Sequence, residues 1–126
     1  MAKRLNIRLV VAPGSAYNID AKHMFQHMSK YVGDNMYHAV QNIGAAWENL
    51  EVPGDITLTN AYVYILNYSG DTVYVDSDGT SAVDGGIMIE LDGFAFFRQP
   101  GSTLRLKCGV GDLCSVEYFI VEGRAV

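Results

Sequence analysis

The sequence predicts an all-β protein, a β-sandwich or jelly roll of about 8 to 10 short antiparallel strands. Its 13 Gly and 8 Tyr among 126 residues are typical of a chain with many turns and pleated strands. Short segments rich in Val, Ile, Tyr and Phe recur along the chain, separated by Gly, Pro and Asp. Helical runs of Ala, Leu, Glu and Lys are scarce, which favours the all-β class.

Length and charge set the broad class of the protein. At 126 residues the chain fits a single domain, residues 1–126, with residues 1–14 as an N-terminal arm. A formal charge of −5 argues against nucleic-acid binding, because phosphate recognition needs a clustered basic surface. No apolar segment approaches the roughly 20 residues that span a bilayer. The apolar patch near the start of the chain is too short for a secretory signal, because Asn6 and Arg8 interrupt it. We therefore expect synthesis in the cytoplasm, with neither nucleic acid nor membrane as a partner.

The first third of the chain predicts three strands. Residues 4–11 alternate apolar and polar side chains, the pattern of a half-buried strand, and Pro13 ends it. Residues 19–32 fit either a strand or an amphipathic helix, and we favour the strand. Gly, Asp and Asn at residues 33–35 predict a turn. Residues 36–43 then alternate between two faces, one of which carries Met36, His38, Val40 and Asn42.

The rest of the chain is organised around residues 61–76, which predict a β-hairpin that turns at residues 69–71. A three-residue turn, which we favour, gives one face with Val63, Ile65, Val73 and Val75 and another with Tyr62, Tyr64, Tyr68 and Tyr74. A two-residue turn would mix the two sets. Because neither face is polar, the hairpin either lies between two covered layers or offers one face to a partner.

Further short strands flank this hairpin. Residues 47–52 precede it and end at the turn that begins with Pro53. Residues 76–86, rich in Asp, Ser and Gly, predict a surface loop. Strands are then expected at residues 87–91, 93–98, 103–107 and 113–121. Over residues 103–108, Leu104, Leu106 and Cys108 should face the interior, and Thr103, Arg105 and Lys107 the solvent.

We expect no catalytic residue, metal site or cofactor. The Asp-rich loop lacks EF-hand spacing, but a looser calcium site formed by Asp71, Asp76, Asp78 and Asp84 stays open beside a plain solvated turn. His23 and His27 lie about 13 Å apart if they are on a strand, too far for one ion. His38 could belong to a Ser-His-Asp site, but the sequence contains no G-x-S-x-G motif for the serine nucleophile of such a site.

The two cysteines, Cys108 and Cys114, flank a short loop and could be bridged across adjacent strands. Because the chain carries no export signal, we favour two buried free thiols over a disulfide. Neither state implies a redox function.

The tyrosines allow three interpretations. Aromatic side chains are enriched in protein interfaces, they can stack on sugar rings, or they can pack beneath another layer of the same protein. The interface hypothesis includes the small cationic cluster near the N-terminus, which suits an acidic neighbour, and the only tryptophan. Its residues are Tyr62, Tyr64, Tyr68, Tyr74, Arg4, Arg8 and Trp47.

A family resemblance extends this interpretation. It is carried by VYILN (63–67), IMIEL (87–91), FAFFR (94–98), TLRLK (103–107) and SVEYFIV (115–121). In strand order and turn placement these segments, within residues 37–121, resemble small structural proteins of tailed bacteriophage virions. The resemblance implies a β-sandwich or jelly roll that assembles in several copies on a capsid or at the neck and tail. It thus implies a non-enzymatic capsid decoration or cement protein, bound in the virion to other virion proteins and to its own copies. A carbohydrate-binding module, or a neck or tail adaptor, is the alternative.

Overall fold

The computed structural model describes residues 3–10, 25–78, 86–109 and 113–123, with residues 9–10 and 25–30 described by their backbone alone. These ranges contain nine strands: β1 (Lys3–Val10), β2 (Phe25–Ile43), β3 (Glu48–Asn49), β4 (Tyr62–Ser69), β5 (Val73–Asp76), β6 (Ile87–Ile89), β7 (Phe94–Arg98), β8 (Arg105–Cys108) and β9 (Cys114–Gly123). No helix occurs within them. The predicted all-β class is confirmed.

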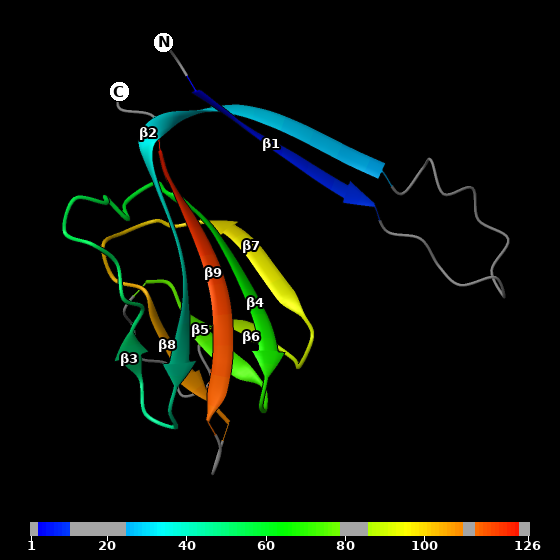
Figure 1. Ribbon diagram of the computed structural model, residues 1–126, viewed down its shortest axis with the longest axis vertical. Coiled ribbons are helices and arrows are strands. Elements are labelled where there is room, and N and C mark those ends of the chain that lie inside the picture. Colours follow the sequence, from blue (N-terminus) through cyan, green and yellow to red (C-terminus); the bar gives the residue numbers. More distant parts are fainter. Residues whose placement is uncertain (1–2, 11–24, 79–85, 110–112, 124–126) are drawn as a thin grey trace, which may run out of the picture.

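The strands form two antiparallel sheets that enclose the core (Figure 1). The five-stranded sheet has the order β1-β2-β9-β4-β7, and the four-stranded sheet the order β3-β8-β5-β6. The outermost strands of the larger sheet are eight and five residues long, and those of the smaller sheet two and three. Fully buried side chains fill the space between the sheets, among them Ile43, Val63, Ile65, Val116, Ile120, Val73, Val75, Ile89, Leu104 and Leu106.

The central segment does not form the predicted hairpin. β4 pairs with β7 and β9 in the five-stranded sheet, whereas β5 pairs with β6 and β8 in the four-stranded sheet. The chain crosses between the sheets at Gly70, where φ is +103° and an added Cβ would lie 2.5 Å from the Leu113 carbonyl oxygen. Val63 and Val73 do face the same interior, but from opposite sides of the sandwich.

The predicted turn at residues 33–35 is also wrong, because β2 runs without interruption through it. The pairing register instead shifts between Val32 and Met36, a bulge that redirects the strand. An added Cβ on Gly33 would lie 2.7 Å from the Gly123 carbonyl oxygen, so β2 and β9 approach closely here. The preference for strand over helix is confirmed for residues 25–32, whereas residues 19–24 lie outside the described ranges.

β1 and the first half of β2, residues 25–32, form a two-stranded ribbon that we call the arm. Figure 1 shows this arm crossing one end of the sandwich and projecting past its side. The strands of the arm are also joined through side chains. The Arg4 guanidinium donates a hydrogen bond to the Tyr31 hydroxyl and lies 4.1 Å from the centre of that ring. β1 falls within the predicted arm of residues 1–14, of which residues 3–10 are described.

The later strands largely follow the prediction. The strands expected at residues 87–91, 93–98, 103–107 and 113–121 correspond to β6, β7, β8 and β9. Leu104, Leu106 and Cys108 face the interior as predicted, while Arg105 and Lys107 on the other side of β8 are half-buried. The strand expected at residues 47–52 is reduced to β3. Most of the predicted surface loop, residues 79–85, lies outside the described ranges.

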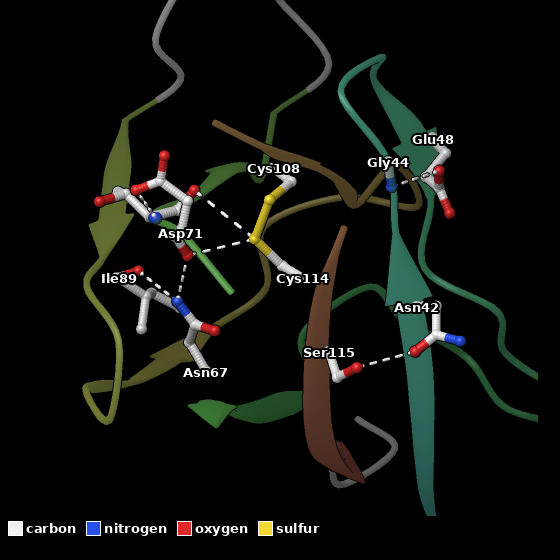
Figure 2. Close-up of a disulfide and its surroundings, with 10 residues drawn as sticks. Asn42, Gly44, Glu48, Asn67, Asp71, Ile89, Cys108, Cys114 and Ser115 are labelled. Carbon is white, nitrogen blue, oxygen red and sulfur yellow. Dashed lines mark hydrogen bonds between the residues drawn. A yellow bond between two sulfur atoms is a disulfide. The ribbon is translucent and has the colours of Figure 1, made fainter. Parts of the chain in front are cut away.

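Cys108 and Cys114 form a disulfide, so the expectation of free thiols is wrong. The two residues stand at the end of β8 and the start of β9, with their Cα atoms 5.6 Å apart (Figure 2). Because β8 and β9 belong to different sheets, the bond joins the two layers at one end of the core. The Cys114 sulfur also lies 3.1 Å from the Asp71 carbonyl oxygen, a contact beside the crossing at Gly70.

Candidate functional site

The outer side of the five-stranded sheet carries a cluster of aromatic rings. Side chains alternate along β4, so Val63 and Ile65 enter the core while Tyr62 and Tyr64 point outward. Neighbouring strands add rings at matching positions, and Tyr64 lies opposite both Phe96 and Phe119. We call this surface the aromatic outer face; it consists of Tyr62, Tyr64, Phe94, Phe96 and Phe119.

The rings of this face are fixed by contacts with one another. Tyr62 and Phe96 are stacked, with ring centroids 6.1 Å apart and an interplanar angle of 12°. The centroids of Tyr64 and Phe94 are 5.8 Å apart, and the Arg98 guanidinium lies 5.7 Å from the centre of Tyr62. Such pairs contribute about 0.5–1.5 kcal/mol each beyond the area they bury. The aromatic outer face is therefore ordered in advance of any partner.

Part of this surface remains open to solvent. Phe94 is 53% exposed, and the flanking Met36 and Val40 of β2 are 59% and 54% exposed. Tyr62, Tyr64, Phe96 and Phe119 are half-buried. A broad, partly open apolar surface of this kind on a small protein is typical of a binding site for another molecule.

The arm lies over one end of the aromatic outer face without closing onto it. A groove of about 300 Å³ separates the two. Leu5 and Ile7 of β1 line the groove and are half-buried, whereas Asn6 and Arg8 also line it but are exposed. The opposite wall is formed by Tyr62, Tyr64, Phe96, Phe119 and Val121. The groove is open to solvent, so the arm covers this end of the aromatic outer face only in part.

The residues predicted to form one interface lie in three places. Tyr62 and Tyr64 belong to the aromatic outer face, and Tyr68 is 44% exposed near the end of β4. Arg4 and Arg8 are on the arm. Tyr74, on β5, and Trp47 lie on the outer side of the four-stranded sheet. A single tyrosine face is thus wrong, because the crossing after β4 places Tyr74 in the other sheet.

The outer side of the four-stranded sheet has its own arrangement of aromatic and basic groups. The Lys107 ammonium lies 4.9 Å from the ring centre of Trp47 and 5.5 Å from that of Tyr74. The Arg105 guanidinium lies 5.8 Å from the Trp47 ring and is 2.6 Å from the carboxylate of the buried Asp76. These cations are held by contacts within the protein. Trp47, expected as an interface residue, is half-buried.

Sequence reasoning missed three members of the aromatic outer face, Phe94, Phe96 and Phe119, and the two apolar residues of the arm that approach it, Leu5 and Ile7. A signal for the phenylalanines was present in FAFFR, which is apolar on both faces in the same way as residues 61–68. The position of the arm over the aromatic outer face had no such signal, because nothing local in the sequence indicates which strands β1 will lie against.

The groups considered for metal binding have other contacts or lie outside the described ranges. Asp71 accepts a hydrogen bond from the Thr72 amide at 2.7 Å, and Asp76 pairs with Arg105. Asp84 and His23 are outside those ranges, and His27 is described by its backbone alone. Within the described ranges, no three His, Cys, Asp or Glu residues are grouped to hold a metal ion.

Two other polar groups, the His38 imidazole and the Tyr118 phenol, have contacts within the protein. The His38 imidazole lies 3.1 Å from the Glu117 carboxylate on the exposed outer side of the five-stranded sheet. Burial raises the pKa of Tyr118 well above its ordinary value, and the nearby Tyr37 raises it further. Its hydroxyl donates a hydrogen bond to the Glu51 carbonyl oxygen at 2.6 Å, which marks it as a structural group of the core.

Comparison with protein-family models, with curated proteins and with solved structures gave no match. In the described part of the chain, no helix is long and apolar enough to cross a bilayer. The function is therefore inferred from the surface of the chain itself.

Proposed function

We propose that this protein is a non-enzymatic structural subunit that joins neighbouring proteins through its aromatic outer face. On the resemblance of residues 37–121, the assembly is a tailed-phage virion and the subunit a capsid decoration or cement protein. One observation carries the proposal. The core between the sheets is closed by other side chains, so Tyr62, Tyr64 and Phe94 form an ordered, partly open apolar surface that the fold itself does not require.

The chemistry of this surface suits contact with protein. Tyr and Phe are enriched in interface cores, and rings already held by stacking lose little conformational freedom when a partner covers them. Each contact can be weak, because a subunit bound in many copies, or in a ring, gains avidity from several contacts at once. The partners are accordingly other virion proteins and further copies of this chain.

The disulfide supports a place in the released virion. Bonds such as Cys108–Cys114 persist in oxidising surroundings and are rare among proteins that stay in the cytosol. A subunit made in the host cytoplasm and carried out in a particle would pass from one environment to the other.

The substitution Tyr64→Asp tests the proposed surface. Because Tyr64 is only half-buried, the introduced carboxylate should leave the monomer folded, which circular dichroism measures. It should abolish assembly, which light scattering measures. Met88→Asp is the matched control, because Met88 is 68% exposed and pairs with Tyr74 on the outer side of the other sheet. A folded Tyr64→Asp variant that assembles like wild type would contradict the proposed interface. Absence of the protein from purified virions would contradict its proposed place in the virion.

A carbohydrate-binding module is the second candidate, and the groove is the observation that favours it. Tyr62 and Tyr64 offer rings for stacking on a sugar, while Asn6 and Arg8 line the same groove with polar groups. A glycan array followed by calorimetric titration with host polysaccharide separates the two candidates. Saccharide binding that Tyr64→Ala removes would favour the carbohydrate-binding module. If no saccharide binds, the structural subunit is the only one of the two candidates that remains.

A further inference from the structure

The arm is joined to the sandwich at a single place, and this determines how it can move. β1 makes extensive contact with β2 but only sparse contact with any other strand. The ribbon meets the sandwich at Val32, which pairs with Gly123 of β9, and the pairing of β2 with β9 is then interrupted until Met36. Residues 33–35 lie within β2, and because ladder pairing with β9 is absent over them, the change in backbone angles that a hinge requires falls at this irregularity.

The contacts of the arm with its own sandwich are incomplete. Besides the groove beneath Leu5 and Ile7, a second cavity of about 160 Å³ lies at the root of the arm, lined by Val32, Met36 and Phe119 among others. Side chains that line such gaps lose the dispersion contacts they would make in a closed interface. The contact that the arm loses when it leaves this position is therefore smaller than that of a fully packed strand.

The arm and the remainder of the chain carry opposite charge. The strands of the arm, residues 3–10 and 25–32, contain four Lys or Arg and no Asp or Glu, a formal charge of +4. Since the whole chain carries −5, and Asp20 and Lys22 cancel, residues 33–126 carry −9. This asymmetry favours contact between the arm of one copy and the sandwich of another, and it disfavours contact between two sandwiches.

From these three observations we infer that copies of this chain exchange arms: β1 and residues 25–32 of one copy cover the aromatic outer face of the next. Leu5 and Ile7 then occupy a neighbour's groove rather than their own, and residues 33–35 are the hinge. Exchange of an identical element is a low-cost route to an oligomer, since the contacts made between copies replace those made within one. The inference rests on the proposed structural function and names a second copy of the chain as the partner.

Cross-linking distinguishes an exchanged arm from one that stays in place. Ile7→Cys and Phe96→Cys put one thiol on each wall of the groove, and the native cysteines do not interfere because they are bonded to each other. The full-length double variant, treated with a short bismaleimide, should give covalent dimers and larger species on denaturing gels. Covalent monomers alone would overturn the exchange.

Mixing two single variants gives the same answer independently. Ile7→Cys protein labelled with ¹⁵N, mixed with unlabelled Phe96→Cys protein, should form labelled–unlabelled dimers whose cross-linked peptide joins the two sites. The control mixture replaces Phe96→Cys with Met88→Cys, an exposed site on the outer side of the four-stranded sheet. It should give a several-fold lower yield of labelled–unlabelled dimers. Equal yields in the two mixtures would overturn the exchange.

Failure of the exchange can be told apart from failure of the proposed function. If wild type assembles and Tyr64→Asp does not, but cross-links form only within one chain, the interface stands and the exchange is overturned. If wild type is strictly monomeric at the concentrations of the cross-linking experiment, both are overturned.

Discussion

Asn67 donates a hydrogen bond to the carbonyl oxygen of Ile89, 3.0 Å away, from a side chain that is fully buried. The same amide group donates a second bond, of 2.8 Å, to the Asp71 carbonyl oxygen (Figure 2). Asn67 is on β4 in the five-stranded sheet and Ile89 is on β6 in the four-stranded sheet. One polar side chain therefore ties the two layers together beside the place where the chain crosses between them.

Replacing this side chain should be costly. Asn67→Ala leaves two carbonyl oxygens without their donor and opens a small cavity, so we expect a loss of about 2–4 kcal/mol in the free energy of unfolding. Asn42→Ala is the control, because Asn42 only accepts a hydrogen bond from Ser115 on the exposed outer side. Urea denaturation measures both, and similar losses for the two variants would contradict the role given to Asn67.

Gly70 should tolerate no side chain. Its φ of +103° is unfavourable for other residues, and a Cβ would lie 2.5 Å from the Leu113 carbonyl oxygen, so Gly70→Ala should destabilise the fold by about 2 kcal/mol or more. Gly101→Ala is the matched control, since a Cβ there meets nothing within 4 Å. Thermal and urea unfolding of the two variants should differ clearly, and equal stability would show that the crossing is not constrained at Gly70.

Reduction of the disulfide should lower stability without abolishing the fold. The bond closes a short loop, with a sequence separation of 6, for which the loss of chain entropy corresponds to about 2 kcal/mol. Urea titrations with and without a reductant measure the difference. The double variant Cys108→Ala/Cys114→Ala should unfold at similar urea in both conditions, and a reductant effect that persists in it would have another origin.

Stability should fall in strongly alkaline solution because of Tyr118. Its pKa is raised in the folded state, so the neutral phenol is fully stabilising below the ordinary value of 10.0 and this contribution is lost as the pH rises above it. Tyr118→Phe should flatten the fall above pH 10 while costing about 1 kcal/mol at neutral pH through the lost bond to Glu51. Tyr68→Phe, at an exposed site, should leave the alkaline profile as in wild type.

Features set by local alternation could be predicted from the sequence. The faces of residues 36–43 and 104–108 followed from side chains that alternate every second residue, and the structure places them as expected. The fold class followed from composition and from the spacing of turns.

Features set by long-range pairing could not. A turn that contains glycine serves equally for a hairpin and for a crossing between sheets, and the choice at Gly70 depends on β4 pairing with β9, about fifty residues later. The same pairing separates Tyr74 from Tyr62 and Tyr64 and brings Phe119 to them instead. The spacing of Cys108 and Cys114 allows a bridge, and the preference for free thiols rests on the lack of a recognisable export signal. That signal carries no information on whether the ends of β8 and β9 converge, as they do in the structure.

The lengths of the outermost strands determine which of the two sheets can add strands from other molecules and so aggregate. β1 and β7, at the borders of the larger sheet, are eight and five residues long, and a long outermost strand can template a foreign strand. β3 and β6, of two and three residues, are too short to do so. Fibril growth from concentrated protein would thus start from the larger sheet only, and suppressing it would need a proline on β1 as well as on β7.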